Sequence, residues 1–229
     1  MNKPFIKAGY AGILLIIISA ALMAVNPGRA LNLPQGFFNP VIAFEFIRTE
    51  TEVYDLFGNN GSSEQGTLVG SFKNGTYIDF LFIVAYAAFL LVFSNVCRRI
   101  TGSKWFIFSG FIILSVVISD IGENIQLLTI MKKLSLEDFG KELMMLNFFT
   151  WAKWGGLTAL FISFIPFLRN SGRFGRVISV TALLSGVTGA AAFLHRSVLN
   201  EIYVLTVEVI FVMLIIFSFT FVYNKQPDK

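Results

Sequence analysis

The chain has 229 residues, of which 55% are hydrophobic, 15% aromatic and only 14% charged, and its mean hydropathy is +0.71. A soluble globular domain carries about 25% charged residues, so the composition excludes a water-soluble domain and predicts an integral membrane protein. The net charge of +4 predicts no nucleic-acid partner, because it is explained by basic residues that gather in particular connections between the membrane spans.

Six apolar stretches are long enough to cross a hydrocarbon layer of about 30 Å, which takes about 20 helical residues. They lie at 9–25, 77–96, 105–128, 148–168, 178–194 and 202–223. The predicted fold is an all-α bundle of six transmembrane helices, and residues 1–229 form a single domain. The first and fifth stretches are short and the third and fourth contain charges, so five and seven spans are the neighbouring alternatives.

The first stretch also resembles a signal peptide in part, since Lys3 and Lys7 precede its apolar core. The segment Ala24-Val-Asn-Pro-Gly-Arg offers no convincing small-x-small cleavage motif. We therefore interpret the first span as a retained membrane anchor.

Basic residues are distributed unevenly between the two sides of the predicted bundle. Ten of the 18 Lys and Arg residues lie in the N-terminus, the second and fourth connections and the C-terminal tail, namely Lys3, Lys7, Arg98, Arg99, Lys104, Arg169, Arg173, Arg176, Lys225 and Lys229. Cytoplasmic connections are enriched in Lys and Arg, so both termini are predicted in the cytoplasm of a chain integral to the plasma membrane. These groups can also contact anionic headgroups, and membrane lipids are therefore the predicted partners.

The third span contains two acids and an amide within about one helical turn. Asp120, Glu123 and Asn124 share one helix face. Ionisable groups within a bilayer are costly and are usually functional. From Trp105 to Asp120 the helix rises by about 22 Å, which puts the acids between the midplane and the outer boundary.

Other charges are predicted at similar depths. Lys153 lies about 7 to 8 Å below the outer edge of the fourth span and Glu208 about 9 Å deep in the sixth. Aspartate is too short to reach far towards water, and Lys153 is flanked by Trp151 and Trp154. The candidate ligand or ion pocket therefore consists of Asp120, Glu123, Asn124, Lys153 and Glu208.

Two alternatives to a pocket remain open. The charges can form an ion-pair network that only fixes helix packing. Alternatively, the side chains can extend along the helix so that their charged ends reach the membrane–water interface. For Glu123 and Glu208 the sequence does not decide between these interpretations and the pocket. Extension to the interface is the favoured interpretation for the charged residues at the span ends, namely Asp79, His195, Arg196 and Glu201.

Small residues predict close helix contacts. They follow the third span at Ser115, Ser119 and Gly122, the fifth at Thr181, Ser185, Gly186, Gly189 and Ala190, and the fourth at Gly155 and Gly156. Small side chains let neighbouring helices approach one another. The same faces could join two copies of the chain, so a homo-oligomer is predicted as one use of them.

The first outer connection, residues 26–76, is too short to be a domain with its own core. Asn39-Pro40 predicts a helix start, so an interfacial helical segment is predicted over 40–57, with a second helix that begins after Thr49 and stops at Gly58. Residues 59–73 predict a mobile loop. Glu45 and Arg48, at i and i+3, form a candidate lid over the pocket, although a pair on the helix surface is the favoured alternative.

Several chemistries are excluded. One histidine and one cysteine rule out the usual zinc, haem and iron–sulfur ligand sets, and the phosphate-binding and serine-elbow motifs are missing. No metal, cofactor or catalytic residue is predicted, and with a single cysteine no intrachain disulfide can form.

Three classes of function remain. The preferred one is an outward-facing pocket that binds a small polar ligand or a lipid headgroup, with or without acid–base chemistry on a lipid. The alternatives are a transporter coupled to protons or cations, and a non-catalytic subunit or assembly factor. Transport predicts a polar path, a lipid site predicts a lateral opening, and a structural subunit predicts a dry, fully paired network. The inner half offers only hydroxyl groups, which weighs against a pore.

Overall fold

The fold is a bundle of long helices, seen in a computed structural model that describes residues 3–58, 63–135 and 138–223. The described residues form eight helices: α1 (Ile6–Val25), α2 (Pro40–Glu45), α3 (Glu50–Phe57), α4 (Ser63–Thr101), α5 (Trp105–Lys133), α6 (Gly140–Leu168), α7 (Gly172–Leu194) and α8 (Val198–Thr220). Six of them, α1 and α4 to α8, are long and apolar enough to cross a membrane. The predicted all-α bundle of six spans is confirmed.

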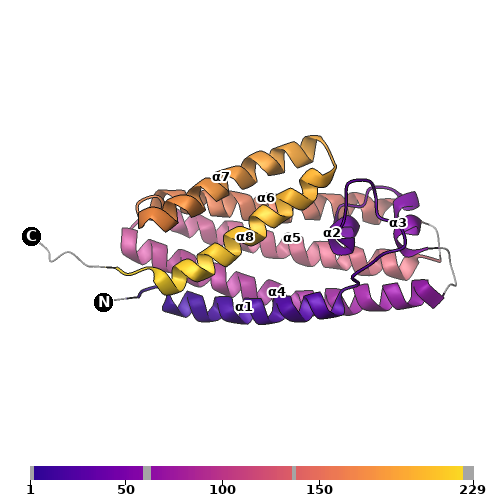
Figure 1. Cartoon of the computed structure of the whole chain (residues 1–229), viewed down its shortest axis with the longest axis horizontal. Helices are drawn as coiled ribbons and strands as arrows, with labels where there is room; N and C mark the ends of the chain where they lie inside the picture. Colours follow the sequence, from indigo (N-terminus) through magenta and orange to yellow (C-terminus); the bar gives the residue numbers. More distant parts are fainter. Residues whose placement is uncertain (1–2, 59–62, 136–137, 224–229) are drawn as a thin grey trace, which may run out of the picture.

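The six long helices form a ring in chain order. Each packs on the next, and α8 packs back on α1. The chain ends lie at one end of the bundle, while α2 and α3 lie at the other (Figure 1). We call these the terminal end and the pocket end. The basic tail residues Lys225 and Lys229 lie outside the described residues.

Aromatic side chains fill the ring at the terminal end. Phe5 is fully buried and its ring lies 4.6 Å from that of Phe93 and 5.5 Å from that of Phe217, measured between centroids. Phe167 and Phe221 complete this aromatic cluster. Aromatic pairs at such distances add to the free energy gained from burying their surface, so the terminal half is a packed apolar core.

Two glycines let α1 close the ring against α8. A Cβ at Gly9 would lie 2.6 Å from the ring of Phe219, and one at Gly12 would lie 2.6 Å from Ile215 Cγ1. Both contacts are at the terminal end. Towards the pocket end α1 and α8 diverge (Figure 1), and this divergence creates the space described below.

Helix α4 corrects the predicted boundary between loop and second span. It has 39 residues and starts at Ser63, so residues 63–73 are helical and not loop; residues 59–62 lie outside the described residues. Leu68 and Val69 pack on the core, and the buried Phe72 contacts Phe44 and Phe57 with ring centroids 5.2 Å away. These contacts outweigh the loop-forming tendency of the Gly and Ser residues.

Both short helices begin where the sequence predicts, and α3 also ends there, whereas α2 ends at Glu45 and does not reach Arg48. Asn39 accepts a hydrogen bond from the N–H of Val41 at the start of α2. The Thr49 hydroxyl accepts one from the N–H of Glu52, and Gly58, with φ of 81°, ends α3. The Glu52 carboxylate accepts a hydrogen bond from the N–H of Arg48. Of the two reciprocal bonds of a Thr49–Glu52 capping box, the structure therefore has only the one from the Glu52 N–H to the Thr49 hydroxyl.

Several small residues are in close contact with side chains of neighbouring helices. A Cβ at Gly122 would meet the ring of Phe149 at 2.8 Å, one at Gly156 would meet Val116 at 2.6 Å, and one at Gly189 would meet Tyr203 at 2.7 Å. These glycines therefore allow neighbouring helices of the same bundle to pack closely. Self-association through the remaining small residues stays a prediction.

Candidate functional site

Lys153 lies at the centre of a buried charged cluster. Its Nζ lies 2.6 Å from Glu123 Oε1, 3.2 Å from Glu45 Oε2 and 3.6 Å from Asp120 Oδ1. The side chain is 7% exposed, and Nζ lies 4.7 Å from the centre of the Trp154 ring. Three carboxylates thus surround one ammonium group, which leaves an excess of negative charge.

The triplet on α5 is buried as a unit. Asp120, Glu123 and Asn124 are all less than 5% exposed. The Tyr86 hydroxyl of α4 donates to Asp120 Oδ2 at 2.8 Å, and Asn124 Nδ2 donates to Asp79 Oδ2, also at 2.8 Å. Both partners come from α4, because the third span's polar face packs against that helix. Glu123 Oε2 is buried with no hydrogen-bond partner among the described residues.

Glu45 enters the cluster from the end of α2. Its Oε2 accepts a hydrogen bond from Trp154 Nε1 at 3.0 Å, and its backbone carbonyl accepts from the Thr150 hydroxyl at 3.1 Å. Arg48 does not accompany it. Since α2 ends at Glu45, the i, i+3 relation fails, and Arg48 is exposed outside the cavity. The structure therefore separates the two residues of the candidate lid.

A cavity of about 530 Å³ adjoins the cluster. Asp120 and Lys153 lie in its lining, together with Asp79, Tyr86 and Glu45. Its side walls come from α1 and α8, namely Ser19, Leu22 and Met23 on one side and Val204, Val207, Glu208 and Phe211 on the other. The cavity thus occupies the space where α1 and α8 diverge.

The cavity opens sideways between these helices. Met23 and Glu208 line it and are nevertheless exposed. Glu208 was predicted to face Lys153, but the structure places it at the rim, with no ion pair or hydrogen bond to another described residue. Its α8 face is shared with Val204, Val207 and Phe211.

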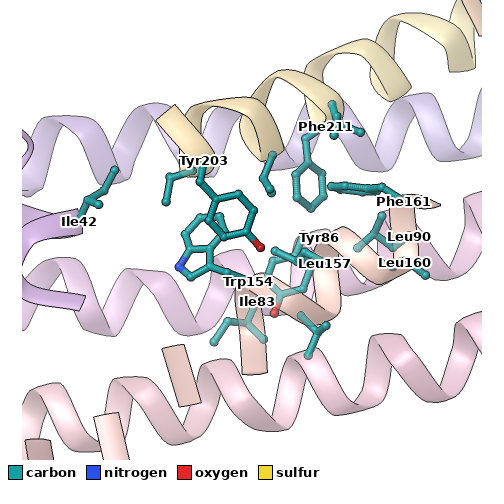
Figure 2. Close-up of a cluster of buried hydrophobic side chains, with 14 of the residues drawn as sticks. Ile42, Ile83, Tyr86, Leu90, Trp154, Leu157, Leu160, Phe161, Tyr203 and Phe211 are labelled. Carbon is teal, nitrogen blue, oxygen red and sulfur yellow. The ribbon is translucent and has the colours of Figure 1, made fainter. Parts of the chain in front are cut away.

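An apolar layer closes the cavity towards the terminal end. Phe211 and Leu157 line its base, and Phe161 meets Phe211 edge to face with centroids 5.2 Å apart. Figure 2 shows Leu90 and Leu160 beside this pair, beyond Tyr86 and Trp154. Phe161, Leu90 and Leu160 are at most 1% exposed. From there the aromatic packing continues to the terminal-end cluster.

Hydrogen bonds and an ion pair hold the connection between α1 and α4 at the pocket end, and they come from α8 and from the segment between α7 and α8. Glu201 accepts hydrogen bonds from the N–H groups of Phe38 and Asn39, both at 2.8 Å. Arg196 pairs with Glu52 at 2.5 Å. These specific contacts replace the predicted extension of Glu201 and Arg196 to the interface, and they hold α2, with its Glu45, in place.

Four of the five predicted pocket residues lie together in the structure, and Glu208 lies apart from them. The structure brings together Asp120, Glu123 and Lys153, with Asn124 beside them. Tyr86 was missed, although it follows Asp79 by seven residues on the same helix face. Asp79 was interpreted as an interfacial group, and only the partner helix reveals its bond to Asn124.

A Tyr86→Phe change tests how strongly the α4–α5 hydrogen bond holds the site. It leaves Asp120 Oδ2 without its donor, so the free energy of unfolding should fall by about 1 to 3 kcal/mol. Chemical unfolding in mixed micelles measures it. Tyr77→Phe, on the same helix but 50% exposed, is the control and should change stability by less than about 0.5 kcal/mol. Equal losses in the two variants would contradict a structural role for the Tyr86 hydroxyl.

The arrangement can hold a polar or charged group in a partly enclosed, low-dielectric space. Carboxylates, a tyrosine hydroxyl and a tryptophan N–H offer both acceptors and donors. Apolar walls beside a few convergent polar groups are typical of ligand sites, whose volumes run from about 300 to 1,000 Å³. Comparison with protein-family models, with curated proteins and with solved structures finds no match to this chain.

Proposed function

We propose that this multi-pass membrane protein binds a small polar ligand or a lipid headgroup in the charged cavity beside Lys153. The observation that carries the proposal is the combination of a buried charged base with a side opening between α1 and α8. Buried charges are costly in a bilayer and are retained where they serve a site. A cavity of about 530 Å³ is large enough for a headgroup.

The cavity faces outward in this proposal. The basic residues of the N-terminus and of the α4–α5 and α6–α7 connections lie at the terminal end. Positive-inside reasoning assigns that end to the cytoplasm, and the cavity then belongs to the outer half of the membrane. A ligand would arrive from the outer leaflet or from the outer aqueous phase.

Two features favour binding over the other functions. The apolar layer around Phe161 and Phe211 interrupts any polar route to the terminal end, which weighs against a conducting path. A purely structural network would be dry and fully paired, yet Glu208 and one oxygen of Glu123 lack partners among the described residues. A ligand in the cavity would supply a partner to Glu208, which lines it.

A Ser19→Trp change tests the proposal by filling the cavity. Ser19 is half-buried on the α1 wall, so an indole there should occupy the space without disturbing the charged cluster. Protein released from membranes in mild detergent is examined by native mass spectrometry. We expect an adduct mass on the unmodified chain and at least about a tenfold lower occupancy in the variant, the loss that about 1.4 kcal/mol of binding free energy produces.

Ile17→Trp is the matched control. Ile17 lies two residues away on α1, is 60% exposed and does not line the cavity, so its adduct occupancy should equal that of the unmodified chain. A chain with no adduct after extraction, or equal loss in the two tryptophan variants, would overturn the proposed binding site.

A further inference from the structure

We propose that the ligand is a membrane-embedded amphiphile with an ammonium head and an apolar tail. This rests on the proposed function and names its ligand class. The head would lie between Glu208, Asp79 and Asp120, and the tail would leave through the mouth between α1 and α8.

The mouth of the cavity suits a tail. Leu22 and Met23 of α1 and Val204 and Val207 of α8 all line the cavity. Met23 is 81% exposed, so this wall continues directly onto the lipid-facing surface of the bundle. An apolar chain that passes from the bilayer into the cavity beside Glu208 can contact these apolar side chains, and it gains free energy by covering them.

The charge of the lining selects the head. Five carboxylate side chains line the cavity, namely Glu45, Asp79, Asp120, Glu201 and Glu208. Among the described lining residues Lys153 is the only cation, and its ammonium group is already within 4 Å of three carboxylates. A phosphate would meet an excess of negative charge with no free cation to pair it, whereas an ammonium group is complementary.

Glu208 marks the place for that ammonium group. The other lining carboxylates have partners: Asp79 is bonded to Asn124, and Glu201 to two backbone N–H groups. Glu208 has none among the described residues, although it lies about 9 Å inside the sixth predicted span, six residues after Ile202. A carboxylate at that depth in a span needs a counter-charge.

Aromatic faces reinforce the preference for a cation. Phe82, Tyr86 and Phe211 all line the cavity, with centroids 5.8 Å apart for Phe82 and Tyr86 and 6.2 Å apart for Tyr86 and Phe211. Ring faces attract ammonium groups within about 6 Å. A cationic head therefore meets both carboxylates and aromatic rings in the same space.

The test compares four probes on the full chain in phosphatidylcholine nanodiscs: dodecylamine, dodecanol, dodecanoate and the tailless butylamine. The concentration that gives half of the maximal thermal stabilisation is measured for each. We expect dodecylamine to act at a concentration about tenfold lower than dodecanol, which is the effect of one ion pair worth about 1.4 kcal/mol. Dodecanoate and butylamine should be weaker than dodecylamine, and Ser19→Trp should abolish the effect.

A Glu208→Gln variant tests the position of the head. It should lose about tenfold in affinity for dodecylamine and leave dodecanol unchanged. Asp138→Asn, an exposed acid outside the cavity, is the control and should keep the preference. Comparing variants cancels the partitioning of each probe into the bilayer, which all variants share.

The outcomes separate this inference from the proposed function. If dodecanol and dodecylamine bind equally and Ser19→Trp blocks both, the cavity is a site for apolar or neutral amphiphiles and the ammonium head is overturned. If butylamine matches dodecylamine, the tail is overturned. If Ser19→Trp and Ile17→Trp respond to every probe alike, the proposed cavity site fails as well.

Discussion

A Lys153→Met variant should lose about 3 to 5 kcal/mol of unfolding free energy, the largest effect that we expect of any single side chain. Methionine replaces the aliphatic part of the lysine but leaves Glu45, Asp120 and Glu123 without their shared cation. An uncompensated buried charge costs more than the lost attraction alone. Chemical unfolding in mixed micelles measures the loss.

Lys133→Met is the matched control. Lys133 also pairs with a glutamate, Glu142, at 2.9 Å, but its side chain is 33% exposed, so its loss should cost less than about 1 kcal/mol. If the two variants lose equal stability, Lys153 is not the central cation of a buried cluster.

The double variant Lys153→Met with Glu123→Gln identifies the closest partner. Glu123 is the nearest carboxylate, at 2.6 Å, and removing its charge relieves part of the excess left by methionine. The double variant should therefore be more stable than the sum of the single losses predicts, by about 1 to 3 kcal/mol. Strictly additive losses would show that the two groups do not interact.

The parts of the fold that could be predicted depend on signals within one helix. Long apolar runs identify six spans, and the caps at Asn39 and Thr49 identify two short helices, because each signal is local. The same holds for the polar face of α5, where Asp120, Glu123 and Asn124 recur with helical spacing. The rise of about 1.5 Å per helical residue then predicts that Lys153 lies at a depth in the membrane similar to that of these acids.

The parts that could not be predicted depend on contacts between distant segments. Glu45 joins the cluster only because α2 is held beside α6 by Trp154 and Thr150. Asp79 and Tyr86 become site residues only when α4 packs on α5. The start of α4 at Ser63 likewise follows from the contacts of Phe72 with Phe44 and Phe57, which no local propensity reveals.

The divergence of α1 and α8 was also missed, although Gly9 and Gly12 carry its signal. Both are small residues in an otherwise apolar stretch, and small residues let membrane helices approach one another closely. The structure adds that this contact is confined to the terminal end. The cavity therefore depends on where the two helices stop touching.

A Gly12→Leu variant should destabilise the protein by about 1 to 3 kcal/mol through overpacking. A Cβ there would already lie 2.6 Å from Ile215 Cγ1, and a leucine must push α1 away from α8. The walls formed by Ser19 and Val207 then move apart, so the variant should also lose the thermal stabilisation by dodecylamine. Unfolding in mixed micelles and the thermal measurement in nanodiscs check the two effects.

Gly110→Leu is the control for the intrinsic effect of the substitution. A Cβ at Gly110 of α5 would have no neighbouring heavy atom within 4 Å, and leucine raises helix propensity equally at the two sites. Gly110→Leu should thus be neutral or slightly stabilising and should keep the response to dodecylamine. If Gly12→Leu behaves in the same way, the contact between α1 and α8 does not shape the cavity, and the side opening must be formed by other elements.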